Sequence, residues 1–299
     1  MKSLLFVLNP CAGQRKANRV LAEIIGIFNR AAYQVITHVT ASQGQATQVV
    51  QQYADSVDLV ICCGGDGTLN ETVAGLLACG RDIPIGYIPA GSTNDLASSL
   101  KLSSDILTAA RDAIEGTPER FDVGSFQGRY FSYVASFGAF TKISYTTPQN
   151  VKNAMGHAAY VFSGIQELTQ IKPKHLRFEL DDGQVIEDDF LFGAISNSTS
   201  IGGILSFPPD TVDLQDGQFE LLLIRPPKDA GEMTEFLSAV QKQTYRCAMV
   251  TLCKARTLHI TAPADMDWTL DGEREPGKAS ITVENHSRAV QIIRREEKK

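Results

Sequence analysis

The chain has 299 residues, which is long enough for two domains because single hydrophobic cores rarely grow beyond about 250–300 residues. Its formal net charge of −6 argues against nonspecific binding to nucleic acid, so we expect no nucleic-acid partner. The six cysteines form no C-x-x-C pair, which argues against a zinc site and against a disulfide framework and fits a reducing cytoplasm.

The first 120 or so residues alternate between strand patterns and helix patterns. The strand patterns are Leu4–Leu8, Tyr33–Val39, Leu59–Cys63, Ile85–Ile88 and a strand beginning at Phe121. The helix patterns are Ala17–Arg30, Gln45–Tyr53, Leu69–Ala78 and Ile106–Glu115. Continuous apolar strands between helices predict a parallel sheet that is covered on both faces. In such sheets ligands bind beyond the carboxyl ends of the strands.

The rest of the chain is rich in strand patterns, separated by turn signals. These patterns are Arg129–Ser136, His175–Leu180, Gln184–Asp188, Phe190–Ser196, Gln218–Ile224, Met249–Leu252, Arg256–Thr261, Trp268–Leu270, Lys278–Val283 and Ala289–Ile293. Two helix candidates, Met155–Gln170 and Ala230–Lys242, interrupt them. We therefore predict an α/β domain over residues 1–124 and an all-β sandwich over residues 125–288. Residues 289–299 form a final strand and tail that can return to the first domain.

The most informative motif is LVICCGGDGT at Leu59–Thr68, which runs into Leu69, Asn70 and Glu71. It predicts a strand, a tight glycine turn and a helix N-terminus, where free backbone N–H groups can bind an anion. Asp66 would repel a phosphate unless a cation lay between them. The motif therefore predicts a nucleotide-phosphate loop that works with a divalent metal, the alternative being a plain strand-to-helix turn. It matches neither the dinucleotide fingerprint nor the P-loop pattern.

Three motifs in fixed order carry a resemblance to a known family. They are NPCAG at Asn9–Gly13, GGDGTLNE at Gly64–Glu71 and PAGSTND at Pro89–Asp95. Together they resemble the catalytic domain of the diacylglycerol kinase family of lipid kinases. Further landmarks follow at Phe121–Gly124, Tyr130–Phe131, Gly156–Tyr160, Asn197, Gly202–Gly203, Asp213–Gly217 and Leu270–Glu273. The match covers nearly the whole chain, and its length is similar to that of the compact bacterial branch.

The resemblance implies ATP-dependent, Mg²⁺-dependent phosphorylation of a lipid hydroxyl, that of diacylglycerol or a similar lipid. The implied fold is a phosphofructokinase-like doubly wound sheet domain followed by a β-sandwich domain, with the active site in the cleft between them. The implied nucleotide-binding residues are Asn9, Pro10, Cys11, Ala12, Gly13, Thr40, Gly64, Gly65, Asp66, Gly67, Thr68, Leu69, Asn70 and Thr93. Asp66 suits the catalytic magnesium, and Asp95 belongs to its metal and water network.

The resemblance also gives roles to two acidic turns in the second half of the chain. On sequence alone, LDGE at Leu270–Glu273 predicts a hairpin turn. The family match makes Asp271 the general base, with Glu273 as the alternative. The loop of Asp213 and Asp216 is similar to a structural magnesium site, in which backbone carbonyls near Asp213 and Gln218 complete the shell. A charged turn without metal is the alternative.

Two other functions remain as alternatives. One is a kinase of a soluble acceptor such as NAD, which should carry a second glycine-serine-threonine motif with a tyrosine, but only Asn197–Ser200 is present. The other is a nucleotide sensor without catalysis, against which the intact Asp66, Asp95 and Asp271 speak. The acceptor lipid and the oligomeric state, a homodimer included, stay open.

The membrane enters these expectations only as the location of the substrate. No apolar stretch approaches the roughly 20 residues that span a bilayer, so we expect no transmembrane segment. We therefore expect a cytoplasmic protein, peripherally associated with the inner membrane face, that reaches a membrane lipid from the surface.

Overall fold

The computed structural model describes residues 2–138, 171–201, 205–207 and 211–295. Within it the chain divides into two compact units, Met1–Val123 with Ser287–Lys299, and Gly124–His286. Strands β5 (Thr117–Phe126) and β18 (Ser280–Arg294) each contribute residues to both units.

The first unit is built on a parallel sheet. Its strands β1 (Lys2–Leu8), β2 (Tyr33–Val39), β3 (Leu59–Gly64) and β4 (Ile85–Pro89) lie in the order β2-β1-β3-β4. The C-terminal part of β18 continues this sheet, with Ile292 paired to Ile85 in parallel. The side chains of β1 and β3 are buried on both faces, as expected for a sheet covered by helices on both sides.

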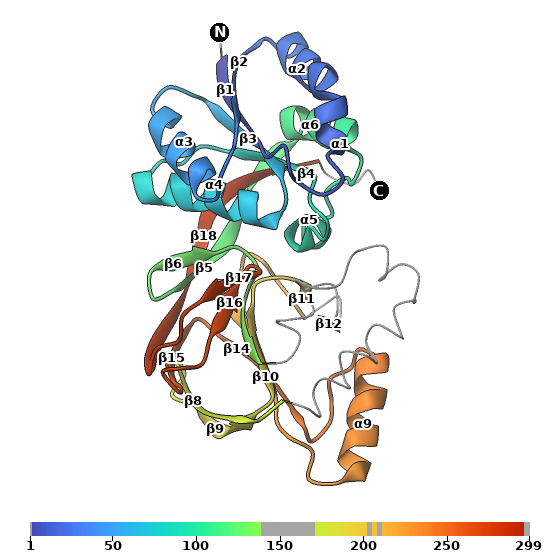
Figure 1. The fold of residues 1–299 in the computed structure, drawn as a ribbon, viewed down its shortest axis with the longest axis vertical. Helices are drawn as coiled ribbons and strands as arrows, with labels where there is room; N and C mark the ends of the chain where they lie inside the picture. Colours follow the sequence, from blue (N-terminus) through green and yellow to red (C-terminus); the bar gives the residue numbers. More distant parts are fainter. Residues whose placement is uncertain (1, 139–170, 202–204, 208–210, 296–299) are drawn as a thin grey trace. The chain divides into compact units, whose positions relative to one another are not determined.

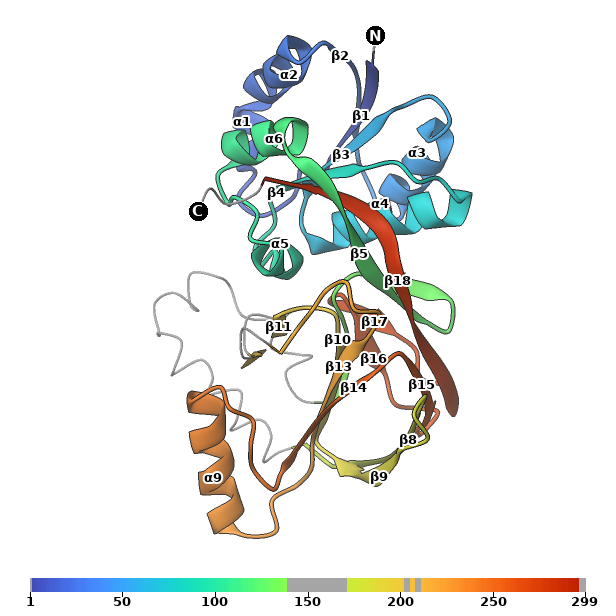
Figure 2. The ribbon, with the colours of Figure 1, turned by 180° about the vertical axis from the view of Figure 1, so that it is seen from behind.

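Helices cover both faces of this sheet, as Figures 1 and 2 show. The helices are α1 (Lys16–Arg19), α2 (Leu21–Arg30), α3 (Gln45–Tyr53), α4 (Asp66–Cys79), α5 (Asp95–Ser99) and α6 (Ile106–Glu115). Alternate strand residues such as Phe6 and Ile61 form one core with Phe28 of α2 and Ala110 of α6. Helices α3 and α4 pack on the opposite face, so the doubly wound class is confirmed.

The second unit is a sandwich of antiparallel strands (Figure 1). One sheet has the order β14-β13-β10-β7-β16-β17, with bounds Val250–Ala255, Phe219–Ile224, Phe192–Ser196, Val134–Gly138, Trp268–Leu270 and Glu273–Glu275. Strand β18 pairs with β15 (Thr257–Thr261), followed by β8 (Lys174–Leu180) and β9 (Val185–Phe190). The short strands are β6 (Arg129–Phe131), β11 (Ser200–Ile201) and β12 (Leu205–Ser206). The all-β class predicted for this half is therefore confirmed.

An aromatic cluster fills the core of the second unit. The Trp268 ring lies 4.9 Å from the Phe137 ring and 5.1 Å from the Phe126 ring, centroid to centroid. All three side chains are almost completely buried. Aromatic pairs at these distances add to the free energy gained from burying their area. This core fixes the strand register, because a one-residue slip would turn each strand's apolar side chains outward.

Several predicted boundaries were wrong for local reasons. The predicted helix Ala17–Arg30 is broken at Val20, whose φ of −114° is not helical. The patterns Lys278–Val283 and Ala289–Ile293 fall mostly on one strand, β18, in which Arg288 has a φ of 51° and donates its backbone N–H to the Asp122 carboxylate. The pattern Arg129–Ser136 is divided between β6 and β7.

Other elements were missed or fall outside the description. Helices α5 and α1 and strand β17 were not predicted as separate elements, since each has at most five residues and too short a pattern. Helix α4 begins at Asp66 rather than at Leu69. The predicted helix Met155–Gln170 and the landmarks Gly156–Tyr160 and Gly202–Gly203 lie outside the described residues. Among the described residues, no helix has the length and apolar character needed to cross a membrane.

Helix α9 (Ala230–Gln241) is anchored to β13 by a salt bridge. The guanidinium of Arg225, directly after β13, donates to both carboxylate oxygens of Glu232 at 2.7 and 2.9 Å. The backbone N–H of Lys228 donates to the same carboxylate at 2.8 Å. These hydrogen bonds, that from Arg225 first, lower the pKa of Glu232 from 4.5 to about 2. Bidentate pairs of this kind are the stronger class of surface ion pair.

We predict that Glu232→Gln lowers the thermal unfolding midpoint at neutral pH. A carboxyl with a lowered pKa in the folded state stabilises the fold above its unfolded pKa and loses that contribution as pH falls through the folded value. The difference between variant and wild type should therefore shrink as pH falls from about 4.5 toward 2. Glu235→Gln, at an exposed position of the same helix, is the control. A difference that does not change with pH would contradict this account.

Candidate functional site

Three turns meet at the carboxyl ends of β1, β3 and β4, and they contact one another through backbone atoms. A Cβ atom on Gly13, whose φ is +47°, would lie 2.4 Å from the carbonyl oxygen of Ala90. A Cβ on Gly91 would lie 2.5 Å from the Cα of Gly65. Any side chain at these positions would force the backbone apart, because real Cβ contacts are not this short. The structure therefore brings together the three motifs that the sequence placed at this edge.

Asn9 connects the first turn to strand β3 and to helix α4. Its backbone N–H donates to the carbonyl of Cys63 at 2.9 Å, and its side-chain amide donates to the hydroxyl of Thr68 at 3.0 Å. Its side-chain oxygen accepts the N–H of Cys11 at 3.0 Å. Pro10 and Cys11 form the rim of this turn, with Cys11 exposed, while Ala12 is buried. Asn9 thus shapes the turn and orients the first turn of α4.

Two residues that sequence reasoning did not assign to the site hold the third turn in place. Asn94, in the left-handed region with φ of 55°, accepts the N–H of Gly91 at 3.0 Å and donates to its carbonyl at 3.1 Å. The hydroxyl of Tyr87 lies 3.3 Å from the Asn94 side-chain oxygen and 3.4 Å from the carbonyl of Gly64. Asn94 had a signal, its place between Thr93 and Asp95 in the PAGSTND motif, but the motif gave it no role of its own. Tyr87 reads as an ordinary core residue of β4.

Asp66 and Asp95 lie side by side at the N-terminus of α5. The Asp66 carboxylate accepts the backbone N–H of Asp95 at 3.2 Å and that of Leu96 at 3.4 Å. It therefore caps α5 from the first residue of α4. Burial raises the pKa of Asp66, against these hydrogen bonds. Asp95 is itself buried, and a buried carboxylate is stabilised by a nearby cation.

Glu71, which ends the GGDGTLNE motif, stabilises a different helix. Its carboxylate accepts the N–H of Gly44 at 2.7 Å and that of Ala46 at 3.1 Å, at the N-terminus of α3. This links α4 to the loop that follows Thr40. Thr40 is buried and donates its N–H to the carbonyl of Leu8 at 2.9 Å. Glu71 thus positions a loop that the resemblance places at the nucleotide.

The remaining residues predicted to bind the nucleotide differ in how far they are exposed to solvent. Thr93 is exposed and Asn70 is partly exposed, whereas Thr68 is buried beneath Asn9. The Leu69 side chain is fully buried, and its N–H donates to the carbonyl of Gly65 at 3.1 Å. These contacts favour a packing role for Leu69, and its predicted nucleotide contact stays a prediction.

In the second unit, Asp271 is a buried residue of a tight hairpin turn. Asp271 and Gly272 connect β16 to β17 with φ values of 47° and 87°, the signs that a type I′ turn requires. The Asp271 carboxylate accepts the backbone N–H groups of Ser132, Tyr133 and Val134, the last two at 3.0 Å. These bonds explain the break between β6 and β7. Both oxygens of the Asp271 carboxylate therefore accept hydrogen bonds from the backbone.

Glu273, two residues later, has a more open environment. Its side chain is 32% exposed, compared with 6% for the whole of Asp271. Its carboxylate accepts from the guanidinium of Arg129, which also donates to Glu275. Asp271 and Glu273, which the sequence left as alternatives for one role, thus differ in burial and in hydrogen-bond partners.

The predicted metal loop is organised by hydrogen bonds to its own backbone. Asp213 accepts the N–H of Gln215 at 3.0 Å, and Asp216 accepts the N–H of Gln218 at 2.9 Å. The ammonium of Lys254 donates to the other oxygen of Asp216 at 2.7 Å. Among the described residues, no three His, Cys, Asp or Glu side chains gather as a metal-binding group.

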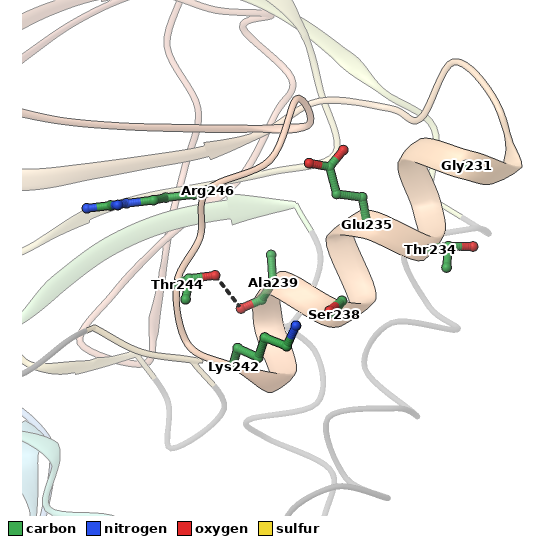
Figure 3. A pocket seen from close by; sticks show the side chains of 8 residues that line it. All are labelled: Gly231, Thr234, Glu235, Ser238, Ala239, Lys242, Thr244 and Arg246. Atoms are coloured by element: carbon green, nitrogen blue, oxygen red, sulfur yellow. Dashed lines mark hydrogen bonds between the residues drawn. The ribbon is translucent and has the colours of Figure 1, made fainter.

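Figure 3 shows a pocket along α9 with a volume of about 650 Å³. Its lining runs from Gly231 to Arg246 and includes Glu235, Lys242 and Thr244. None of the predicted site residues lies in this lining. The pocket therefore adds nothing to the site built at the sheet edge.

Comparisons with known proteins bear on both units. The model of the diacylglycerol kinase catalytic domain matches residues 3–126, and that of the YegS C-terminal NAD kinase beta sandwich-like domain matches residues 135–294. The chain is 31% identical to a diacylglycerol kinase of Bacillus subtilis (strain 168), covering 91% of this chain and 90% of that protein. It is 31% identical to a diacylglycerol kinase of Staphylococcus epidermidis, covering 98% of this chain and 92% of that one.

A solved structure agrees with these matches. A crystal structure from Bacillus anthracis strain Sterne, of a protein proposed to be a diacylglycerol kinase, aligns with a TM-score of 0.80 and 26% identity. The alignment covers 98% of this chain and 95% of that one. The motifs, the fold and the relatives agree, and the chain belongs to the bacterial diacylglycerol kinase family.

Proposed function

We propose that this chain is a lipid kinase that transfers the γ-phosphoryl group of ATP to the hydroxyl of diacylglycerol or a similar lipid. The observation that carries the proposal is the close packing of three glycine-bearing turns beside Asp66 and Asp95. It occurs in a chain whose relatives are named diacylglycerol kinases over nine-tenths of its length. Phosphoryl transfer depends on positioning and on neutralising phosphate charge, and at this edge backbone N–H groups would do the first and a cation held by carboxylates the second.

The first unit binds the nucleotide in this proposal. The turns at Asn9–Gly13, Gly64–Thr68 and Pro89–Asp95 offer backbone N–H groups to the phosphates, because glycine allows the chain to approach them closely. Asp66 and Asp95 would hold Mg²⁺, since carboxylate oxygens suit a hard cation and the backbone of Asp95 lies against the Asp66 carboxylate. Mg²⁺ commonly binds one or two protein carboxylates together with phosphate oxygens and water, so a three-residue cluster is not needed. The cation would neutralise charge that builds on the phosphates.

The proton acceptor in this proposal is one of the two acidic residues of the turn Asp271–Glu273. Glu273 is our preferred residue, because its side chain is 32% exposed whereas Asp271 is buried. Asp271 is the positioning residue, since its oxygens already hold the backbone of Ser132, Tyr133 and Val134. This reverses the order of preference that the resemblance implied, on the ground of burial and hydrogen bonding.

No observation in the structure favours a soluble acceptor or a sensor without catalysis. The sandwich matches a domain described as NAD kinase-like, but the curated relatives that extend over both units are named diacylglycerol kinases. A lipid acceptor implies that the chain meets its substrate at a membrane surface. Peripheral association with the inner membrane face therefore remains part of this proposal.

The acceptor is tested by phosphate transfer. Wild-type chain with labelled ATP and Mg²⁺ should label diacylglycerol, or a closely similar lipid, in mixed micelles. NAD and other soluble acceptors should stay unlabelled. Asp66→Asn keeps an acceptor for the α5 cap, so it should stay folded and lose activity. Labelling of a soluble acceptor alone, or full activity of Asp66→Asn, would contradict the proposal.

We predict different effects for the two acidic residues of the second unit. Glu273→Gln should lower kcat by about 10²–10⁴-fold, the usual contribution of a general base, while the unfolding midpoint stays near that of wild type. Asp271→Asn should lower the unfolding midpoint, since an amide cannot accept three N–H groups through both atoms. Glu275→Gln, which removes the other partner of Arg129, is the control. Equal losses of kcat in Glu273→Gln and Glu275→Gln would refute a base role for Glu273.

A further inference from the structure

Lys254 of β14 lies directly opposite Glu220 of β13 in the antiparallel register. Its Nζ atom is 2.7 Å from the Asp216 Oδ2 atom and 3.3 Å from the Glu220 Oε1 atom. The Glu220 side chain is only 1% exposed, and burial raises the pKa of Glu220 to about 8 in spite of the nearby ammonium, so this carboxyl is largely protonated at neutral pH. The charged partner of the Lys254 ammonium is therefore Asp216 of the acidic loop.

The packing of the sandwich core determines where Lys254 lies along its strand. Leu221 and Leu223, on the same strand as Glu220, are fully buried in the core of the second unit. Strand β13 is buried along its whole length, and its antiparallel register with β14 places Glu220 opposite Lys254. The fold thus brings the two residues together, and the half-exposed lysine side chain reaches from β14 to Asp216.

This arrangement does not fit the structural magnesium that the resemblance places at the same loop. Asp216 is the residue whose side chain would ligate that cation, and both of its oxygens are engaged. Oδ1 accepts the N–H of Gln218, and Oδ2 accepts from Lys254. A divalent cation at Oδ2 would lie beside the ammonium, and the two positive charges would repel each other.

We propose that the ammonium of Lys254, and not a divalent cation, neutralises the loop Asp213–Gln218 in this chain. The positive charge beside the loop then belongs to a side chain of the protein itself, so the structure of the loop is independent of the Mg²⁺ concentration. The proposal does not depend on the kinase activity, because it concerns how one loop of the second unit is stabilised.

Thermal unfolding of the full chain, in EDTA and in excess Mg²⁺ without nucleotide, tests this proposal. Asp216→Asn isolates the loop from any other site at which Mg²⁺ binds, and it keeps an oxygen that can accept from Gln218. We expect the shift in midpoint between EDTA and Mg²⁺ to be the same for wild type and Asp216→Asn. A shift that is present in wild type and lost in Asp216→Asn would show that a metal holds the loop and would overturn the proposal.

The lysine itself is tested by Lys254→Met, which keeps much of the apolar stem and removes the charge. In EDTA it should lower the midpoint by about 2–4 °C, because the Asp216 carboxylate loses its ionic partner. Lys278→Met, at an exposed lysine of the same unit, should not. Equal midpoints for the two variants would overturn the proposal. If Lys254→Met does not fold, calorimetric titration of Mg²⁺ decides: a binding event found in wild type but absent in Asp216→Asn counts against Lys254, and identical heats support it.

Discussion

The backbone-to-backbone contact between the turns that follow β1, β3 and β4 is the constraint on which the rest of the site depends. Gly13 lies against Ala90, and Gly65 lies against Gly91, with no space for a Cβ atom at Gly13 or Gly91. This closeness concentrates backbone N–H groups at one edge of a parallel sheet. Backbone and not side chains therefore lines the contact between the turns, and this backbone is the surface that we propose for the phosphates.

The acidic residues of the motifs act first as structural acceptors. Asp66 caps α5, Glu71 caps α3, and Asp271 holds the strand break between β6 and β7. Each carboxylate belongs to one element and accepts backbone N–H groups of another. The chemistry that we assign to Asp66 is therefore built on a residue that already has a structural partner. A substitution that removes the acceptor, such as alanine, would combine loss of folding with loss of activity, so the amide variant is the more informative one.

Local patterns were sufficient where one period of apolar residues extends over a whole element. The bounds of β2, α3 and α6 agree with the predicted Tyr33–Val39, Gln45–Tyr53 and Ile106–Glu115, because their strand or helix periodicity has no interruption. The three glycine turns were also predictable, since glycine and proline mark strand ends. The start of α4 could not be predicted, because Asp66 and Gly67 are typical turn residues. The sequence does not show that Asp66 accepts the N–H groups at the start of α5.

Contacts between residues far apart in sequence could not be predicted from these patterns. Lys254 is a polar residue of an edge strand until the register places it opposite Glu220. Asp271 and Glu273 differ in burial because Asp271 accepts the N–H groups of Ser132–Val134, about 140 residues earlier in the chain. Only the tertiary fold brings these groups together. Sequence reasoning found the acidic turn but had no basis for ranking its two carboxylates by burial.

Amide hydrogen exchange of the full chain, with and without ATP and Mg²⁺, tests the central claim most directly. The account predicts slower exchange at residues 9–13, 64–68 and 89–95 when nucleotide binds, because phosphates accept from these backbone N–H groups. Strands β13 and β14 should exchange as in the free protein. Nucleotide binding that protects other segments and leaves all three turns unchanged would contradict the account.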